Sequence, residues 1–184
     1  MRSSRRARLL EAATTLFARR GFRGAGIDAI LEEAKVARMT LYHHFGSKEQ
    51  LVRDVLDLHE ARVVGAYSAA MADVEDPRAR IRAAFEHLAT ELANQPPGGD
   101  LFLRYAFEGD GDASANEVVA RYRGRMRELF EAPFTELGAA EPGEHAESIL
   151  ALIDAARVSA LMGGGDGAAK RALAMADMVI DAAT

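Results

Sequence analysis

At residues 27–51 the chain reads IDAILEEAKVARMTLYHHFGSKEQL. Its apolar residues follow helical spacing in two short runs, at 27–34 and 38–45, and only Lys35-Val36-Ala37 separates them. Two short helices joined by about three residues are typical of a helix-turn-helix, whose second helix enters the major groove of DNA. This stretch therefore predicts a DNA-binding motif.

The second helix of the motif has the composition that a groove-facing helix needs. Leu41 and Phe45 lie four residues apart, on the side that faces the core. No carboxylate occurs from Lys35 to Lys48, so nothing on this surface repels phosphate. The predicted DNA-contacting residues are Arg38, Met39, Thr40, Tyr42, His43 and His44 on the helix, with Lys35 and Lys48 beside it.

The rest of the chain also has helical patterns, and no segment alternates with a period of two. We expect further helices at about 9–21, 48–72, 77–92, 101–107, 114–138, 143–162 and 168–183, with breaks at the Pro- and Gly-rich stretches 95–99 and 108–112. The predicted fold class is all-α.

Composition narrows the function. Of the 184 residues, 49% are hydrophobic, which is enough for a sizeable core, and no long apolar run is present. The absence of cysteine excludes disulfides and thiol chemistry, and we expect a cytoplasmic protein without a membrane span. Residues 1–53 carry a formal charge of +6 and residues 54–184 one of −11, which indicates a polyanion-binding head on an acidic body.

Three stretches resemble the TetR family of transcriptional regulators: LEAA at 10–13, LFARRGF at 16–22 and TLYHHFGSKEQL at 40–51. The resemblance covers roughly residues 5–53. It implies a helix-turn-helix domain at 1–46 and a helical effector-binding and dimerisation domain at 47–184. Thr40, Tyr42 and Lys48 match family positions that touch DNA.

The sequence departs from the family pattern at three places in the head. A hydroxyl that usually begins the second helix is missing at Ala25-Gly26. Lys35 replaces a glycine in the turn, at a cost of about 1 kcal/mol if that position is left-handed. Ala37 replaces a serine that often caps the next helix.

For the body, the resemblance implies an effector pocket among the helices at 48–137. Its aromatic and apolar residues favour a small hydrophobic effector, although each of them could instead belong to the core. The predicted ligand-binding residues are His59, Arg62, Phe85, Leu88, Phe102, Tyr105, Tyr122 and Met126.

The last two helices are apolar nearly all round, which predicts that a partner chain covers them. The predicted homodimer interface consists of Ile149, Ile153, Ala156, Ala160, Leu173, Ala176, Val179 and Ile180. The first of these helices has a second apolar face, formed by Leu152, Ala155, Ser159 and Met162.

The resemblance implies a homodimeric repressor that binds a palindromic DNA operator and is released by the effector. No catalytic constellation, metal site or cofactor is expected. Gly163-x-Gly165-x-x-Ala168 follows a helix and lacks the strand context of a dinucleotide site. The alternative is a helical small-molecule-binding protein with a vestigial head; an enzyme is a third reading that no nucleophile–base pair supports.

Overall fold

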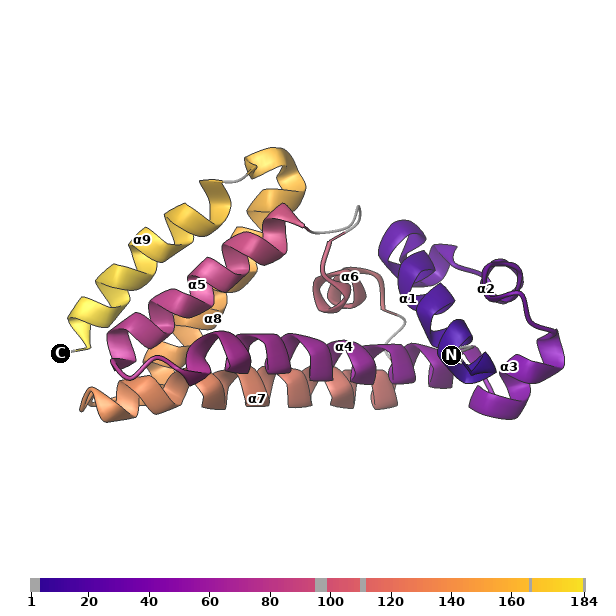
Figure 1. Ribbon diagram of the computed structural model, residues 1–184, viewed down its shortest axis with the longest axis horizontal. Helices are drawn as coiled ribbons and strands as arrows, with labels where there is room; N and C mark the ends of the chain where they lie inside the picture. Colours follow the sequence, from indigo (N-terminus) through magenta and orange to yellow (C-terminus); the bar gives the residue numbers. More distant parts are fainter. Residues whose placement is uncertain (1–3, 95–98, 110–111, 166, 184) are drawn as a thin grey trace. The chain divides into compact units, whose positions relative to one another are not determined.

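The computed structural model describes residues 4–94, 99–109, 112–165 and 167–183, and Figure 1 shows that these form helices joined by short connections. No strand occurs within these ranges, so the all-α prediction is confirmed. The predicted breaks at 95–98 and 110–111 lie outside the described residues. In order, the helices are α1 (Arg5–Gly24), α2 (Ile27–Ala34), α3 (Arg38–Phe45), α4 (Lys48–Ala72), α5 (Pro77–Ala93), α6 (Leu101–Glu108), α7 (Ala113–Glu136), α8 (Pro142–Ser159), a π-helical turn (Ala160–Gly164) and α9 (Gly167–Ala182).

The helices group into two compact units. The first contains the described residues up to Ala61 and those from Gly99 to Ala120, and the second contains Arg62–Asn94 and Arg121–Ala183. Helices α4 and α7 therefore contribute to both units. The functional division at residues 46 and 47 stays a prediction. In the described ranges, no helix combines the length and apolarity that crossing a membrane requires.

In the first unit, α1 packs against α2, α3 and α6. Leu9 and Phe17 of α1, Ile30 of α2 and Leu41 of α3 are fully buried, as helical spacing predicts. The sequence predicts that the first helix ends at Gly21, and the structure places a bend there instead. Gly21 has a φ of 77°, which glycine adopts without strain, and the helix resumes as far as Gly24.

In the second unit, α9 packs against α8 and α5 around a buried arginine (Figure 1). Arg157 is 1% exposed. Its Nε and Nη2 donate to the two carboxylate oxygens of Glu91, at 3.0 and 3.1 Å, and Nη1 donates to the Tyr122 hydroxyl at 2.9 Å. The guanidinium also lies 5.8 Å from the centre of the Tyr67 ring, and burial raises the pKa of that tyrosine well above its usual value. Every side of the buried charge is thus met by an acceptor or a ring face.

We predict that Glu91→Ala lowers the free energy of unfolding by about 3 kcal/mol, because it leaves a buried guanidinium without its counter-charge. The double variant Glu91→Leu/Arg157→Met should recover most of that loss, since it removes both charges and keeps the volume. Urea denaturation measures both. A double variant as unstable as Glu91→Ala would show that packing at Glu91, and not the unpaired charge, causes the loss.

Candidate nucleic-acid interface

The helix-turn-helix has the predicted bounds, with α2 ending at Ala34 and α3 beginning at Arg38. Leu41 and Phe45 are buried, and the opposite side of α3 is open. Met39 is 78% exposed, Thr40 is half-buried, and the other predicted α3 residues are exposed, namely Arg38, Tyr42, His43 and His44. The predicted DNA-contacting side chains of α3 therefore form one accessible surface.

The backbone of the turn has the conformation that the sequence departures predict. Lys35 is left-handed, with φ 53° and ψ 51°, and is the one non-glycine residue with positive φ in the described part of the chain. Gly26 and Ala37 occupy the N-cap positions of α2 and α3, and neither helix has a side-chain cap. The first N–H groups of both helices are therefore left for water or for an anion.

We predict that Lys35→Gly raises the free energy of unfolding by about 1 kcal/mol, because glycine adopts the left-handed conformation without a β-carbon clash. Lys35→Ala is the matched control, since it removes the same side chain but keeps the β-carbon. Denaturation in urea compares the two. Equal stabilities of the two variants would mean that the left-handed backbone at this position carries no strain.

Two cations of the head already contact carboxylates. Arg38 forms an ion pair with Asp28 of α2. Arg6 forms one with Asp54 of α4 at 2.5 Å, and its guanidinium lies 5.3 Å from the centre of the Phe45 ring. Exposed ion pairs of this kind contribute about 0–1 kcal/mol, so exchanging a carboxylate for a phosphate costs little.

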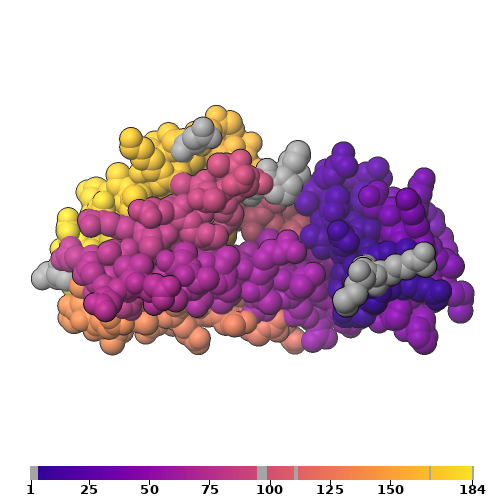
Figure 2. Space-filling model, viewed as in Figure 1, coloured from indigo at the N-terminus to yellow at the C-terminus, as the bar shows by residue number. Residues whose placement is uncertain are grey.

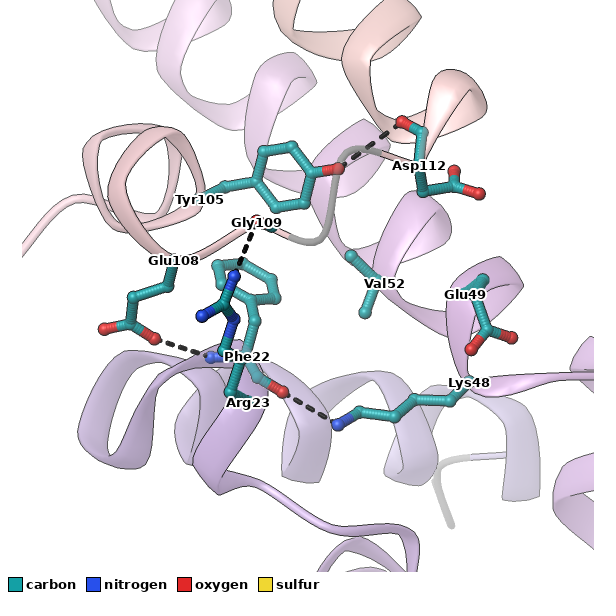
Figure 3. Close-up of a pocket in the computed structure, with 9 residues that line it drawn as sticks. All are labelled: Phe22, Arg23, Lys48, Glu49, Val52, Tyr105, Glu108, Gly109 and Asp112. Carbon is teal, nitrogen blue, oxygen red and sulfur yellow. Dashed lines mark hydrogen bonds between the residues drawn. The ribbon is translucent and has the colours of Figure 1, made fainter.

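Lys48 has a partner that the sequence did not predict. Its ammonium donates to the carbonyl oxygen of Phe22 at 2.8 Å, and so connects the start of α4 to α1 (Figure 3). An ammonium group has three N–H donors, so two remain for another acceptor. No sequence signal could have identified this partner, because every residue carries a backbone carbonyl.

The two adjacent histidines of α3 do not belong to a metal site. The ring centres of His43 and His44 lie 5.3 Å apart, with the rings tilted by 65°. Within the described ranges, no group of three or more His, Cys, Asp or Glu side chains is placed to hold a metal ion.

The predicted ligand-binding residues fall into both units. In the first, Nε2 of His59 lies 2.9 Å from Oδ2 of Asp100, and the His59 ring lies 5.1 Å from that of Phe102. Tyr105 instead packs against Phe22 of α1, with ring centres 5.3 Å apart. Asp100 was missed, although an aspartate directly before an apolar run is an N-cap signal, and it does cap α6.

The remaining predicted ligand-binding residues lie in the second unit. Phe85, Leu88 and Met126 are buried, and the Tyr122 hydroxyl accepts from Arg157. Arg62 is exposed. The structure thus brings His59 and Phe102 together, while the buried residues of the second unit serve its core.

Burial divides the predicted dimer residues. Ile149, Ile153, Ala156, Ala176 and Ile180 lie in the chain's own core, and Ala160, Leu173 and Val179 are half-buried. The buried side chains cannot meet a partner because α5, α8 and α9 already cover them. The exposed apolar residues here are Met162 (82%), Met178 (73%), Met175 (55%) and Leu161 (48%). Helix α9 is drawn in yellow at the surface in Figure 2.

Comparison with known proteins gives consistent matches. Residues 9–55 match the profile of a family described as "Bacterial regulatory proteins, tetR family". The HTH-type transcriptional activator FasR of Mycolicibacterium smegmatis is 37% identical over 119 residues, which are 65% of this chain and 54% of FasR. The HTH-type transcriptional repressor KstR2 of Rhodococcus jostii is 39% identical over 82 residues, which are 45% of this chain and 40% of KstR2. The chain thus spans about half the length of these relatives.

The fold also matches solved structures. The crystal structure of SCO4454, a TetR-family transcriptional regulator from Streptomyces coelicolor, superposes with a TM-score of 0.88. The match covers 97% of this chain and 95% of that one, at 25% sequence identity. The likeness therefore extends over the helices of both units and is not confined to the head.

Proposed function

The chain belongs to the TetR family of transcriptional regulators, and on that premise we propose that it is a ligand-responsive regulator that binds operator DNA as a homodimer. Members of this family are regulators and not enzymes, in agreement with the sequence prediction. The observation that carries the proposal is the exposed α3 surface, which follows a three-residue turn and lacks carboxylates from Lys35 to Lys48.

In this proposal α3 enters the major groove, with Thr40 near a base edge and with Tyr42 and Lys48 on phosphates. A two-fold dimer presents two such helices to successive major grooves, about 34–36 Å apart, which requires a palindromic operator. An effector that binds better to a conformation with a different spacing lowers DNA affinity.

The relatives include both an activator and a repressor. We propose repression, because a dimer that occupies a promoter blocks it without any further protein contact. A reporter driven by the chain's own upstream DNA tests this: expression should rise when the regulator is deleted, and a fall would indicate activation.

For DNA binding, we predict that Lys48→Ala lowers the slope of log K against log salt by about 1 per site lost, because one phosphate contact releases one counterion fewer. Lys170→Ala is the matched control, since it removes the same charge from α9. Fluorescence anisotropy on the upstream DNA, from low to high salt, gives the slopes.

Thr40→Ala should instead change sequence preference and leave the salt slope unaltered, because a base contact specifies and a phosphate contact positions. Equal slopes for Lys48→Ala and wild type would remove Lys48 from the interface. If the wild-type chain binds no DNA at all, the alternative of a small-molecule-binding protein with a vestigial head gains support.

For the dimer, we propose an interface on the outward side of α8 and α9, centred on the exposed methionines. The second apolar face of α8 supports this choice, because Ala155 is exposed and Leu152 and Ser159 are half-buried. Small and apolar residues at helical spacing let two helix pairs pack closely as an isologous four-helix interface.

We predict that Met178→Glu gives a monomer that no longer binds operator DNA, because it places a charge in the interface. Leu58→Glu is the matched control, since it puts the same charge on an exposed apolar residue of α4. Light scattering reports the mass of each variant. A Met178→Glu variant that remains dimeric would move the interface away from this face of α9.

We further propose that the effector is small and largely hydrophobic, and that it binds among the helices from α4 to α7. The apolar and aromatic character of Phe85, Leu88, Phe102, Tyr122 and Met126 supports this class. Native mass spectrometry of the purified protein would show a retained small molecule as an added mass, and its absence under extraction-free purification would count against a tight effector.

A further inference from the structure

A cavity of about 180 Å³ lies in the first unit, between the end of α1, the start of α4 and the end of α6 (Figure 3). Three buried apolar side chains, Phe22, Val52 and Tyr105, form one part of its lining. Charged side chains form the other part. An engineered cavity of about 150 Å³ holds a benzene molecule, so there is room here for one ring.

Two of the three carboxylates in the lining already have donors. Glu108 accepts from Arg104 at 2.7 Å and from the Phe22 N–H at 3.1 Å. A hydrogen bond from Ser47 lowers the pKa of Glu49, which is therefore ionised, and Glu49 also lies in the first turn of α4, where the helix dipole favours a negative charge.

The third carboxylate, Asp112, caps the start of α7. It accepts from the Ser114 hydroxyl at 2.6 Å and from the Ala115 N–H at 2.9 Å, and these bonds lower its pKa. All three negative charges are thus compensated by a cation, by hydrogen-bond donors or by a helix N-terminus.

The two cations of the lining have only neutral acceptors. Arg23 donates to the Gly109 carbonyl at 3.3 Å, and Lys48 donates to the Phe22 carbonyl at 2.8 Å. Neither is ion-paired with any carboxylate in the part of the chain that the structure describes. Both side chains border the same space in Figure 3. The charge that remains available to a ligand is therefore positive.

We propose that this cavity binds a compact monocarboxylate whose apolar part is about the size of one aromatic ring. Its carboxylate accepts charge-assisted hydrogen bonds from Arg23 and Lys48, which are stronger than the bonds these cations now make to carbonyls. Its apolar part packs against Phe22, Val52 and Tyr105.

Occupation of this cavity also has a regulatory consequence, which rests on the proposed function. The ligand uses Lys48, the same ammonium that is proposed to hold a DNA phosphate, and it joins α1, α4 and α6. Because one ammonium then serves two anions, ligand and DNA weaken each other's binding by the same factor.

The test uses sodium benzoate as the probe, titrated into the full chain at constant ionic strength and followed by ¹H–¹⁵N NMR. The expected result is saturable shifts at the amides of Phe22, Val52 and Tyr105. Arg23→Gln should raise the Kd about tenfold, which is what loss of one charged hydrogen bond predicts. Arg20→Gln is the matched control, because it removes the same charge from an exposed position one turn earlier on α1. Its Kd should stay within about twofold of wild type.

Benzamide, which keeps the ring and lacks the charge, should bind at least tenfold more weakly than benzoate. Shifts confined to the second unit, equal affinities of Arg23→Gln and Arg20→Gln, or equal binding of benzamide and benzoate would each overturn the assignment.

Addition of benzoate to the protein–DNA complex should lower DNA affinity in wild type and much less in Arg23→Gln. This arm separates the two proposals. Saturable benzoate binding without any DNA binding would leave the cavity assigned and remove the proposed function. DNA binding without benzoate shifts would do the reverse.

Discussion

The backbone of Phe22 holds the first unit together, because its polar groups and its ring all have partners on different helices. Its N–H donates to Glu108 of α6, and its carbonyl accepts from Lys48 of α4. Its ring stacks on Phe17, with centres 4.7 Å apart, and meets the edge of Tyr105. The bend at Gly21 makes this possible, since it frees the N–H from the helix ladder. A β-carbon at Gly21 would lie 1.9 Å from the Glu108 carboxylate, so glycine is required there both for its φ and for space.

This arrangement gives the head its particular electrostatics. Cations are numerous there, but several are already engaged: Arg38 with Asp28, Arg6 with Asp54, and Lys48 with a carbonyl. The first two contacts are solvent-exposed and weak, so they orient the side chains without withholding them from DNA. The Lys48 contact differs, because its acceptor belongs to the same residue that connects α1 to α6. Any anion that attracts Lys48 therefore acts on the contact between α4 and α1.

The sequence predicted local features well and distant partners poorly. The bounds of α2 and α3 follow from periodicity, and the left-handed Lys35 follows from the missing glycine, because both depend on neighbouring residues. The Glu108–Phe22 contact joins residues 86 positions apart, and Arg157 and Glu91 are 66 positions apart. No local pattern encodes such pairs. Periodicity also separated the two apolar faces of α8 but could not tell which one faces inward, since a repeat of 3.6 residues defines faces only relative to each other.

The orientation of α8 is decided by its one buried charge. Arg157 must reach Glu91 of α5 and the Tyr122 hydroxyl of α7, and successive residues on a helix are about 100° apart. A rotation of α8 by one residue would withdraw the guanidinium from Glu91 and expose Ile153 in place of its neighbour. Because an unpaired buried charge costs several kcal/mol, the rotation is strongly disfavoured. The ion pair thus keeps Ile149 and Ile153 in the core and Ala155 and Met162 outward. A polar contact inside the second unit thereby determines the apolar surface that a second copy of the chain would meet.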